Sequence, residues 1–213
     1  MRRLDGKRPG ILGVGSAVPS QVLSNQDLER MVDTSDQWIL ERSGIRERRI
    51  APPGVCTSDL AAEAAVAALA DAGTQPSEID LVIVATVTPD TIFPATSCLV
   101  QHRLGMMNAA AFDLSVGCTG FIYGLSTASQ FVANGTCRKV LVIGADLLSR
   151  ITDWEDRNTC VLFGDGAGAV VVGETENGNG ILSFVLGTDG SGAVLLKMPA
   201  GGSRQPASHD TVD

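Results

Sequence analysis

Three short, dense runs of apolar residues constrain the fold of this chain more than any other feature. They cover residues 81–85, 140–144 and 169–173, and each is rich in β-branched residues without polar alternation. Such runs are typical of strands that are buried on both faces of a largely parallel sheet. Weaker runs at residues 11–14 and 110–114 are candidates for further strands of the same sheet.

Helical patterns alternate with these runs. They cover about residues 57–72 and 96–104, and a third pattern begins near Cys118. A glycine follows each pattern, and glycine frequently ends a helix. The alternation of strands and helices predicts an α/β layered domain.

The character of the chain changes after residue 173. A turn-rich stretch follows, residues 181–186 are predicted to form one more strand, and residues 197–213 lack an apolar face. We therefore expect residues 1–173 to form the layered domain. Residues 174–213 should form a connection that is mostly loop.

Composition argues against several classes of protein. The net charge of −8 disfavours binding to nucleic acid or to an anionic membrane surface, since both favour a basic face. No stretch of the sequence approaches the ~20 apolar residues of a membrane span. Five widely spaced cysteines without a C-x-x-C pair indicate neither a disulfide framework nor a zinc site. No metal is therefore expected, and a reducing cytoplasm fits this cysteine usage best.

Cys118 stands where a strand-like run ends and a helical pattern begins. The free N–H groups at a helix start favour an anion and can lower the pKa of a thiol from its usual ~8.5. One interpretation is therefore a nucleophilic thiolate, and the other is a small buried hydrophobic residue, the usual fate of a free cysteine. Neither histidine of the chain, His102 or His209, lies in a context that pairs it with this thiol.

The segment that begins at Thr34 predicts a short helix with a possible ligand-binding face. Thr34 and Gln37 have the spacing of a capping box, and Trp38 and Arg42 fall on the same helix face. An indole beside a guanidinium could stack a flat base, or it could simply pack the helix down. Four nearby arginines could form either a site for an anionic ligand or a solvated charged face: Arg42, Arg46, Arg48 and Arg49.

Two glycine-rich segments are interpreted as structural. Gly13-Val-Gly15 follows a presumed strand, but Val18 occupies the third glycine position of a dinucleotide motif and no helical pattern begins there. Residues 163–168 are predicted to form a tight turn before the third apolar run.

Taken together, these residues resemble the β-ketoacyl-acyl-carrier-protein synthase III family. These are the initiating condensing enzymes of bacterial fatty-acid synthesis, within the thiolase superfamily. The resemblance covers the whole chain, and its most specific blocks are residues 33–39, 42–46, 112–121, 156–159 and 163–168. It implies a thiolase-like layered α/β fold whose N-terminal βαβαβαββ half is complete and whose C-terminal half is only begun.

The resemblance also implies roles for individual residues. Cys118 matches the nucleophile that receives an acyl group from acyl-CoA, and its own N–H would contribute to the oxyanion hole. Phe93 matches a residue that reaches across a homodimer interface toward the partner's acyl pocket. Phe163 matches a residue near the floor of the active site.

The implied coenzyme A groove involves four residues. Trp38 and Arg157 match the pair that sandwiches the adenine, and Thr34 and Arg42 match residues that line the groove. The implied reaction condenses the acyl group, which comes from acetyl-CoA, with malonyl-acyl-carrier protein. No cofactor is implied, because the coenzyme A thioester is a substrate.

One departure from the family pattern opens two alternatives. The family's catalytic histidine and asparagine lie in motifs resembling "PHQAN" and "GNTS", and this sequence contains neither. The pattern therefore implies a chain that lacks its C-terminal part. The chain could be a half that retains only coenzyme A binding and acylation, or it could belong to a related synthase that uses another acyl starter in secondary metabolism.

Overall fold

The computed structural model describes residues 8–176 and 179–211. The chain forms two compact units, and the boundary between them falls between Ser183 and Phe184. The first unit contains every α-helix and β-strand of the described residues. Within the second unit, the described residues form two short 3-10 helices, Gly190–Val194 and His209–Thr211.

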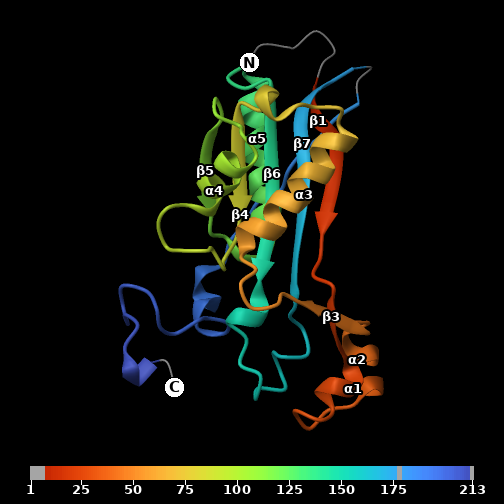
Figure 1. Cartoon of the computed structure of the whole chain (residues 1–213), viewed down its shortest axis with the longest axis vertical. Coiled ribbons are helices and arrows are strands. Elements are labelled where there is room, and N and C mark those ends of the chain that lie inside the picture. The colour runs from red at the N-terminus through yellow and green to blue at the C-terminus, as the bar shows by residue number, and fades with distance from the viewer. Residues whose placement is uncertain (1–7, 177–178, 212–213) are drawn as a thin grey trace. The chain divides into compact units, whose positions relative to one another are not determined.

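The first unit is built on a five-stranded sheet with the strand order β1-β7-β6-β4-β5 (Figure 1). Its strands are β1 (Arg8–Ala17), β4 (Leu81–Ala85), β5 (Ala110–Leu114), β6 (Lys139–Leu147) and β7 (Asp165–Thr175). Each of the three dense apolar runs lies in a strand of this sheet, so the layered α/β prediction is confirmed.

The direction of one strand differs from the prediction. Strand β4 pairs in parallel with β5 and β6, whereas β7 pairs antiparallel with both β6 and β1. The expectation of a largely parallel sheet is therefore wrong for β7. Val171 and Val172 of β7 are fully buried, as parallel strands usually are. The apolar composition of residues 169–173 indicates that this strand is buried on both faces of the sheet. A strand can be buried in this way whether it is parallel or antiparallel to its neighbours.

Helices cover both faces of the sheet (Figure 1). Helix α3 (Thr57–Asp71) and helix α4 (Thr96–Arg103) pack on one face, and helix α5 (Gly120–Ala133) packs on the other. A glycine with a positive φ follows each helix within two residues of its last residue, as the sequence predicts. The first unit thus has a helix, sheet, helix arrangement.

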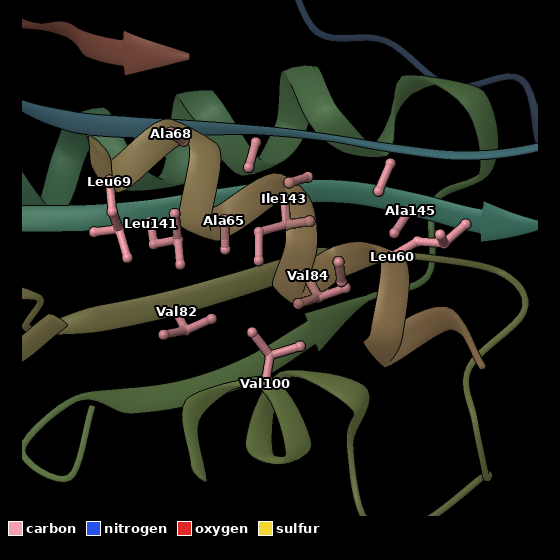
Figure 2. Packing of buried hydrophobic residues seen from close by; sticks show 14 of the residues in the cluster. Leu60, Ala65, Ala68, Leu69, Val82, Val84, Val100, Leu141, Ile143 and Ala145 are labelled. Atoms are coloured by element: carbon pink, nitrogen blue, oxygen red, sulfur yellow. The ribbon is translucent and has the colours of Figure 1, made fainter. Parts of the chain in front are cut away.

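The larger apolar core lies between the sheet and the α3 face. Figure 2 shows side chains of α3 over the strands β4 and β6, with Val100 of α4 beside them. All of these residues are at most 5% exposed: Leu60, Ala65, Ala68, Leu69, Val82, Val84, Val100, Leu141, Ile143 and Ala145. Most of the α3 contacts are alanines, so the helix lies close to the sheet.

Two glycines of β1 allow the closest approach of this helix. A Cβ atom on Gly15 would lie 2.3 Å from both Ala64 O and Ala68 N, which are backbone atoms of α3. A Cβ atom on Gly13 would lie 2.3 Å from Ala72 N, just after the same helix. Gly13 and Gly15 are therefore required for the close packing of α3 on β1. This packing explains a glycine pair that lacks the helix of a dinucleotide motif.

A small insertion lies between β1 and α3. It consists of β2 (Gln21–Ser24), α1 (Asn25–Leu28), α2 (Asp36–Ser43) and β3 (Glu47–Ile50), and β2 pairs antiparallel with β3. Ser35 caps α2 by accepting a hydrogen bond from Trp38 N at 3.1 Å, so the predicted capping box of Thr34 is wrong by one residue. Gly44 ends the helix in the left-handed conformation, with a φ of 74°.

Two further predictions of local structure are wrong. Residues 165–168 already belong to β7 rather than to a turn, because their backbone groups pair with β1 and β6. Residues 181–186 form no strand. In this stretch Ile181 N donates to Pro9 O, but no ladder continues from that bond.

The close approach of α3 gives a first prediction. Replacing Gly15 with alanine should lower the free energy of unfolding by about 1–3 kcal/mol, because the new methyl group meets helix backbone that cannot rotate away. Gly168→Ala is the matched control, since it lies in a strand of the same sheet and its Cβ would meet nothing within 4 Å. Urea denaturation would measure both, and equal stability of the two variants would contradict the packing role.

Candidate active site

Cys118 lies at the junction between β5 and α5. It is the middle residue of a 3-10 turn, Gly117–Thr119, that leads directly into α5. Gly117 has a φ of 62°, a conformation that favours glycine, and this allows the chain to turn sharply from strand to helix. The Cys118 side chain is exposed, and its backbone N–H belongs to a first helical turn, where N–H groups lack partners within the helix.

A pocket of about 190 Å³ opens beside this thiol. Its lining combines the carboxyl ends of β4 and β6, the amino end of β7 and the start of α5: Ala85, Gly117, Cys118, Phe121, Gly144, Ala145, Asp146, Gly164 and Gly166. In α/β sheets, ligands usually bind outside the carboxyl ends of the strands. Cys118 thus occupies the expected end of the sheet for a reactive group.

Two glycines of α5 fix the helix start against the strands. A Cβ atom on Gly120 would lie 2.9 Å from the Cβ of Ala85, and one on Gly124 would lie 2.8 Å from Val142 Cγ1. Helix α5 is therefore as close to β4 and β6 as its backbone allows. This contact sets the height of Cys118 above the strand ends.

The other cysteines differ from Cys118 in their surroundings. Burial raises the pKa of the Cys137 and Cys160 thiols, which disfavours their thiolates. Burial, followed by the nearby carboxylate of Asp90, also raises the pKa of the Cys56 thiol. Of the five cysteines, all of them free, Cys118 is the one that lines the pocket.

Among the residues that the structure describes, neither a histidine nor a metal cluster accompanies the thiol. His102 lies in α4 and His209 lies in the second unit, and neither lines the pocket. Within residues 8–176 and 179–211, no three His, Cys, Asp or Glu side chains gather closely enough to hold a metal ion. In the same ranges, no helix is both long and apolar enough to span a bilayer.

Trp38 forms a separate cluster with two arginines. The guanidinium carbon of Arg42 lies 5.0 Å from the centroid of the Trp38 ring, and that of Arg157 lies 4.9 Å from it. Both distances are within the range of cation–π attraction. Arg157 Nη1 also lies 3.4 Å from Asp33 Oδ2, an exposed pair. The structure therefore brings together three of the four residues predicted for the coenzyme A groove.

A small apolar core packs against Trp38 of this cluster. It consists of Leu28, Ile39, Cys160 and Val161, which are at most 3% exposed, with Trp38 and Trp154 packed against it. Arg48 crosses the core, donating to Val161 O and to Asn25 Oδ1. Asn25 in turn donates to Asp36 Oδ1 at 2.7 Å and to Ile45 O at 2.9 Å. This network ties the start of α2 to the segment that carries Arg157.

The buried position of Arg48 changes the interpretation of the arginine cluster. Arg48 is only 4% exposed, and burial lowers the pKa of its guanidinium. Arg49 pairs with Glu47 at 2.8 Å. The four arginines therefore do not form one basic surface, and Arg42 contributes to the Trp38 cluster instead.

The remaining predicted site residues lie apart from the thiol. Phe93 is 88% exposed and does not line the pocket of its own chain. Phe163 is half-buried beside the pocket residue Gly164 but is not part of the lining. Thr34 precedes the N-cap of α2, and its hydroxyl is buried without a hydrogen-bond partner among the described residues.

Sequence reasoning missed two aspartates near the pocket. Asp146 lines it, at the end of β6. Asp165 accepts hydrogen bonds from Ala51 N at 2.7 Å and from Ser149 N at 2.9 Å, and is 6% exposed. Each follows or precedes a buried apolar run, and a carboxylate at the pocket end of a strand is the signal that could have identified both.

Comparison with known proteins shows which proteins this chain resembles. Residues 112–197 match the family described as 3-oxoacyl-[acyl-carrier-protein (ACP)] synthase III. A β-ketoacyl-[acyl-carrier-protein] synthase III from Caldanaerobacter subterraneus subsp. tengcongensis is 64% identical over 204 residues, which cover 96% of this chain and 62% of that relative. The chain thus spans less than two thirds of the length of this relative.

Solved structures agree with the sequence comparison. The β-ketoacyl-[acyl-carrier-protein] synthase III of Thermus thermophilus is similar with a TM-score of 0.83 and 51% identity, covering 87% of this chain and 57% of that chain. The priming β-ketosynthase of the R1128 polyketide biosynthetic pathway has a TM-score of 0.78 and 41% identity, covering 83% and 53%. In its thiolase-like fold and in its strand-to-helix cysteine, the chain is similar to β-ketoacyl-[acyl-carrier-protein] synthase III proteins.

Proposed function

We propose that Cys118 accepts an acyl group from acyl-CoA in a β-ketoacyl-acyl-carrier-protein synthase III reaction. The observation that carries this proposal is the position of the exposed Cys118 thiol. It lies at a helix start, in a pocket at the carboxyl ends of β4 and β6. The N–H groups at a helix start and the helix dipole favour the negative charge that develops on the oxyanion of a thioester under attack.

In the acylation step, the Cys118 thiolate attacks the thioester carbonyl of acyl-CoA. A new carbon–sulfur bond forms, the bond to the coenzyme A sulfur breaks, and coenzyme A leaves as the thiolate. In the condensation step, malonyl-acyl-carrier protein loses carbon dioxide, and the resulting carbanion attacks the acyl-Cys118 thioester. Cys118 is then released as the thiolate, and a 3-oxoacyl-acyl-carrier protein is formed. The step that involves the carrier protein is proposed for the whole protein, since the chain covers 62% of its relative.

We propose that Trp38, Arg42, Arg157 and Thr34 bind the coenzyme A moiety. A base stacked between Trp38 and Arg157 needs about 7 Å between them, twice a van der Waals contact of ~3.5 Å. Arg157 lies 4.9 Å from the ring, so it must swing outward before a base can enter. The exposed ion pair with Asp33 that holds Arg157 contributes only about 0–1 kcal/mol, so this opening is easy.

Phe93 and Phe163 are proposed to shape the acyl pocket. Phe163 adjoins Gly164 at the edge of the pocket. The large exposure of Phe93, and its absence from the pocket of its own chain, support contact with the pocket of a second copy in a homodimer. Five free cysteines support a cytoplasmic location. In this proposal the coenzyme A thioester is a substrate, and no separate cofactor takes part.

The acylation step gives a direct prediction. Incubation with acetyl-CoA should add the mass of one acetyl group to the peptide that contains Cys118, as measured by mass spectrometry after digestion. Cys118→Ala should abolish the adduct, whereas Cys98→Ala, which removes another exposed thiol, should retain it. An adduct that persists in Cys118→Ala would exclude this residue as the nucleophile.

The stacking role of Trp38 gives another prediction. Trp38→Ala should weaken coenzyme A binding roughly 5- to 150-fold, the range expected for the loss of one base–aromatic contact. Trp38→Phe keeps an aromatic face and should retain most of the affinity. Isothermal titration calorimetry would measure both variants, with Arg30→Ala, an exposed arginine outside the cluster, as a control. Unchanged affinity in Trp38→Ala would reject the stacking role.

The choice of starter separates the proposed function from its closest alternative. The pocket of about 190 Å³ favours a small acyl group, so acetyl-CoA should acylate Cys118 faster than branched or longer acyl-CoA. Single-turnover acylation rates with the three substrates would measure this preference. Faster acylation by a longer or branched acyl-CoA would support a synthase that uses a different starter.

A further inference from the structure

The carboxylate of Asp146 holds a turn at the mouth of the Cys118 pocket. Four donors from residues 86–88 end on the single oxygen Asp146 Oδ1: Thr86 Oγ1 at 2.9 Å, Val87 N at 2.8 Å, Thr88 N at 3.2 Å and Thr88 Oγ1 at 3.0 Å. Thr86 and Thr88 are 5% and 9% exposed. Hydrogen bonds to a charged acceptor are stronger than those to a neutral one, so this turn is held firmly.

The turn is also tied to neighbouring strands and helices. Thr88 Oγ1 accepts a hydrogen bond from Leu147 N at 2.8 Å, and Thr88 N donates to Thr86 Oγ1 at 3.1 Å. Thr57 at the start of α3 donates its hydroxyl to Thr88 O. The end of β4 is therefore joined to the end of β6 and to α3 through one small polar network.

This network acts on the wall of the pocket that faces the thiol. Residues 86–88 directly follow Ala85, which lines the pocket and against which Gly120 packs. Gly120 begins α5, two residues after Cys118. A shift of the turn would therefore move Ala85 and the helix start that carries the nucleophile.

We propose that Asp146 is a positioning residue for Cys118, acting through the turn at residues 86–88 and the Ala85 wall. The inference deepens the proposed function and rests on acylation of Cys118. The role requires an acceptor at this place more than a full negative charge, because an amide oxygen could still accept hydrogen bonds from the turn, although weaker ones than the carboxylate accepts. Asparagine at this position should therefore preserve the function, whereas alanine should not.

The first test compares acylation rates. Asp146→Ala should lower the single-turnover rate of Cys118 acylation by acetyl-CoA between 10- and 100-fold, since small misplacements of reacting groups have effects of this size. Asp146→Asn should stay within about 3-fold of the wild type. A rate for Asp146→Ala within 2-fold of wild type, or equal impairment of both variants, would overturn the positioning role.

A matched control separates positioning from general destabilisation. Asp80 also bridges neighbouring strands, because its Oδ2 accepts from Arg138 N at 2.7 Å and Lys139 N at 3.3 Å, but it lies before β4 at the opposite end of the sheet. Asp80→Ala should leave the acylation rate of the folded protein within about 3-fold of wild type. Equal loss of rate in Asp80→Ala and Asp146→Ala would point to destabilisation alone and overturn the proposal.

A second measurement does not require acyl-CoA. Hydrogen exchange should quicken at least 10-fold at the amide of Val87 in Asp146→Ala and remain near wild type in Asp146→Asn, because the lost carboxylate is the acceptor of this N–H group. Unchanged exchange in Asp146→Ala would overturn the inference whatever the acylation result. If acetyl-CoA fails to acylate the wild-type protein, but exchange in Asp146→Ala still quickens as expected, the proposed function is refuted. The hold of Asp146 on the turn is then established independently.

Discussion

The close contact of α5 with β4 and β6 is the constraint on which the candidate active site depends. Gly120 and Gly124 have no side chains to separate the helix from Ala85 and Val142, so the helix backbone lies against the sheet. Densely packed interiors deform little, and a helix held in this way cannot slide without creating a void or a clash. The thiol of Cys118, two residues before Gly120, therefore has a defined height above the strand ends.

Aspartate carboxylates hold the loops at the pocket end of the sheet in place. The loops at the pocket end of the sheet expose backbone N–H groups, and each such group needs an acceptor. Asp146 supplies one for the turn after β4, Asp165 for Ala51 and Ser149, and Asp113 for Thr96 and Ser97 at the start of α4. In an acidic chain, part of the negative charge thus serves to order loops around the pocket rather than to repel ligands.

Sequence periodicity predicted the parts of the fold that local forces determine. The bounds of α3, α4 and α5 follow from apolar spacing and terminal glycines, and the strand-to-helix position of Cys118 follows from the same pattern. The direction of β7 could not be predicted, since burial on two faces gives the same composition in either direction. The choice of Ser35 over Thr34 as N-cap depends on which hydroxyl accepts from the Trp38 N–H, and sequence spacing does not decide this. The contact between Arg157 and Asp33 joins positions 124 residues apart, so it arises only in the folded chain.

The antiparallel direction of β7 has a consequence for how such a site can diversify. Strand β6 ends and strand β7 begins at the same end of the sheet, which is the end with the pocket. The intervening residues 148–164 therefore start and finish beside the pocket. This one uninterrupted stretch carries Arg157 and two of the four core residues near Trp38, Cys160 and Val161. Recombination or loop grafting could therefore exchange residues 148–164, and with them the surface beside the indole, as one unit. The pairing between β6 and β7 would stay unchanged.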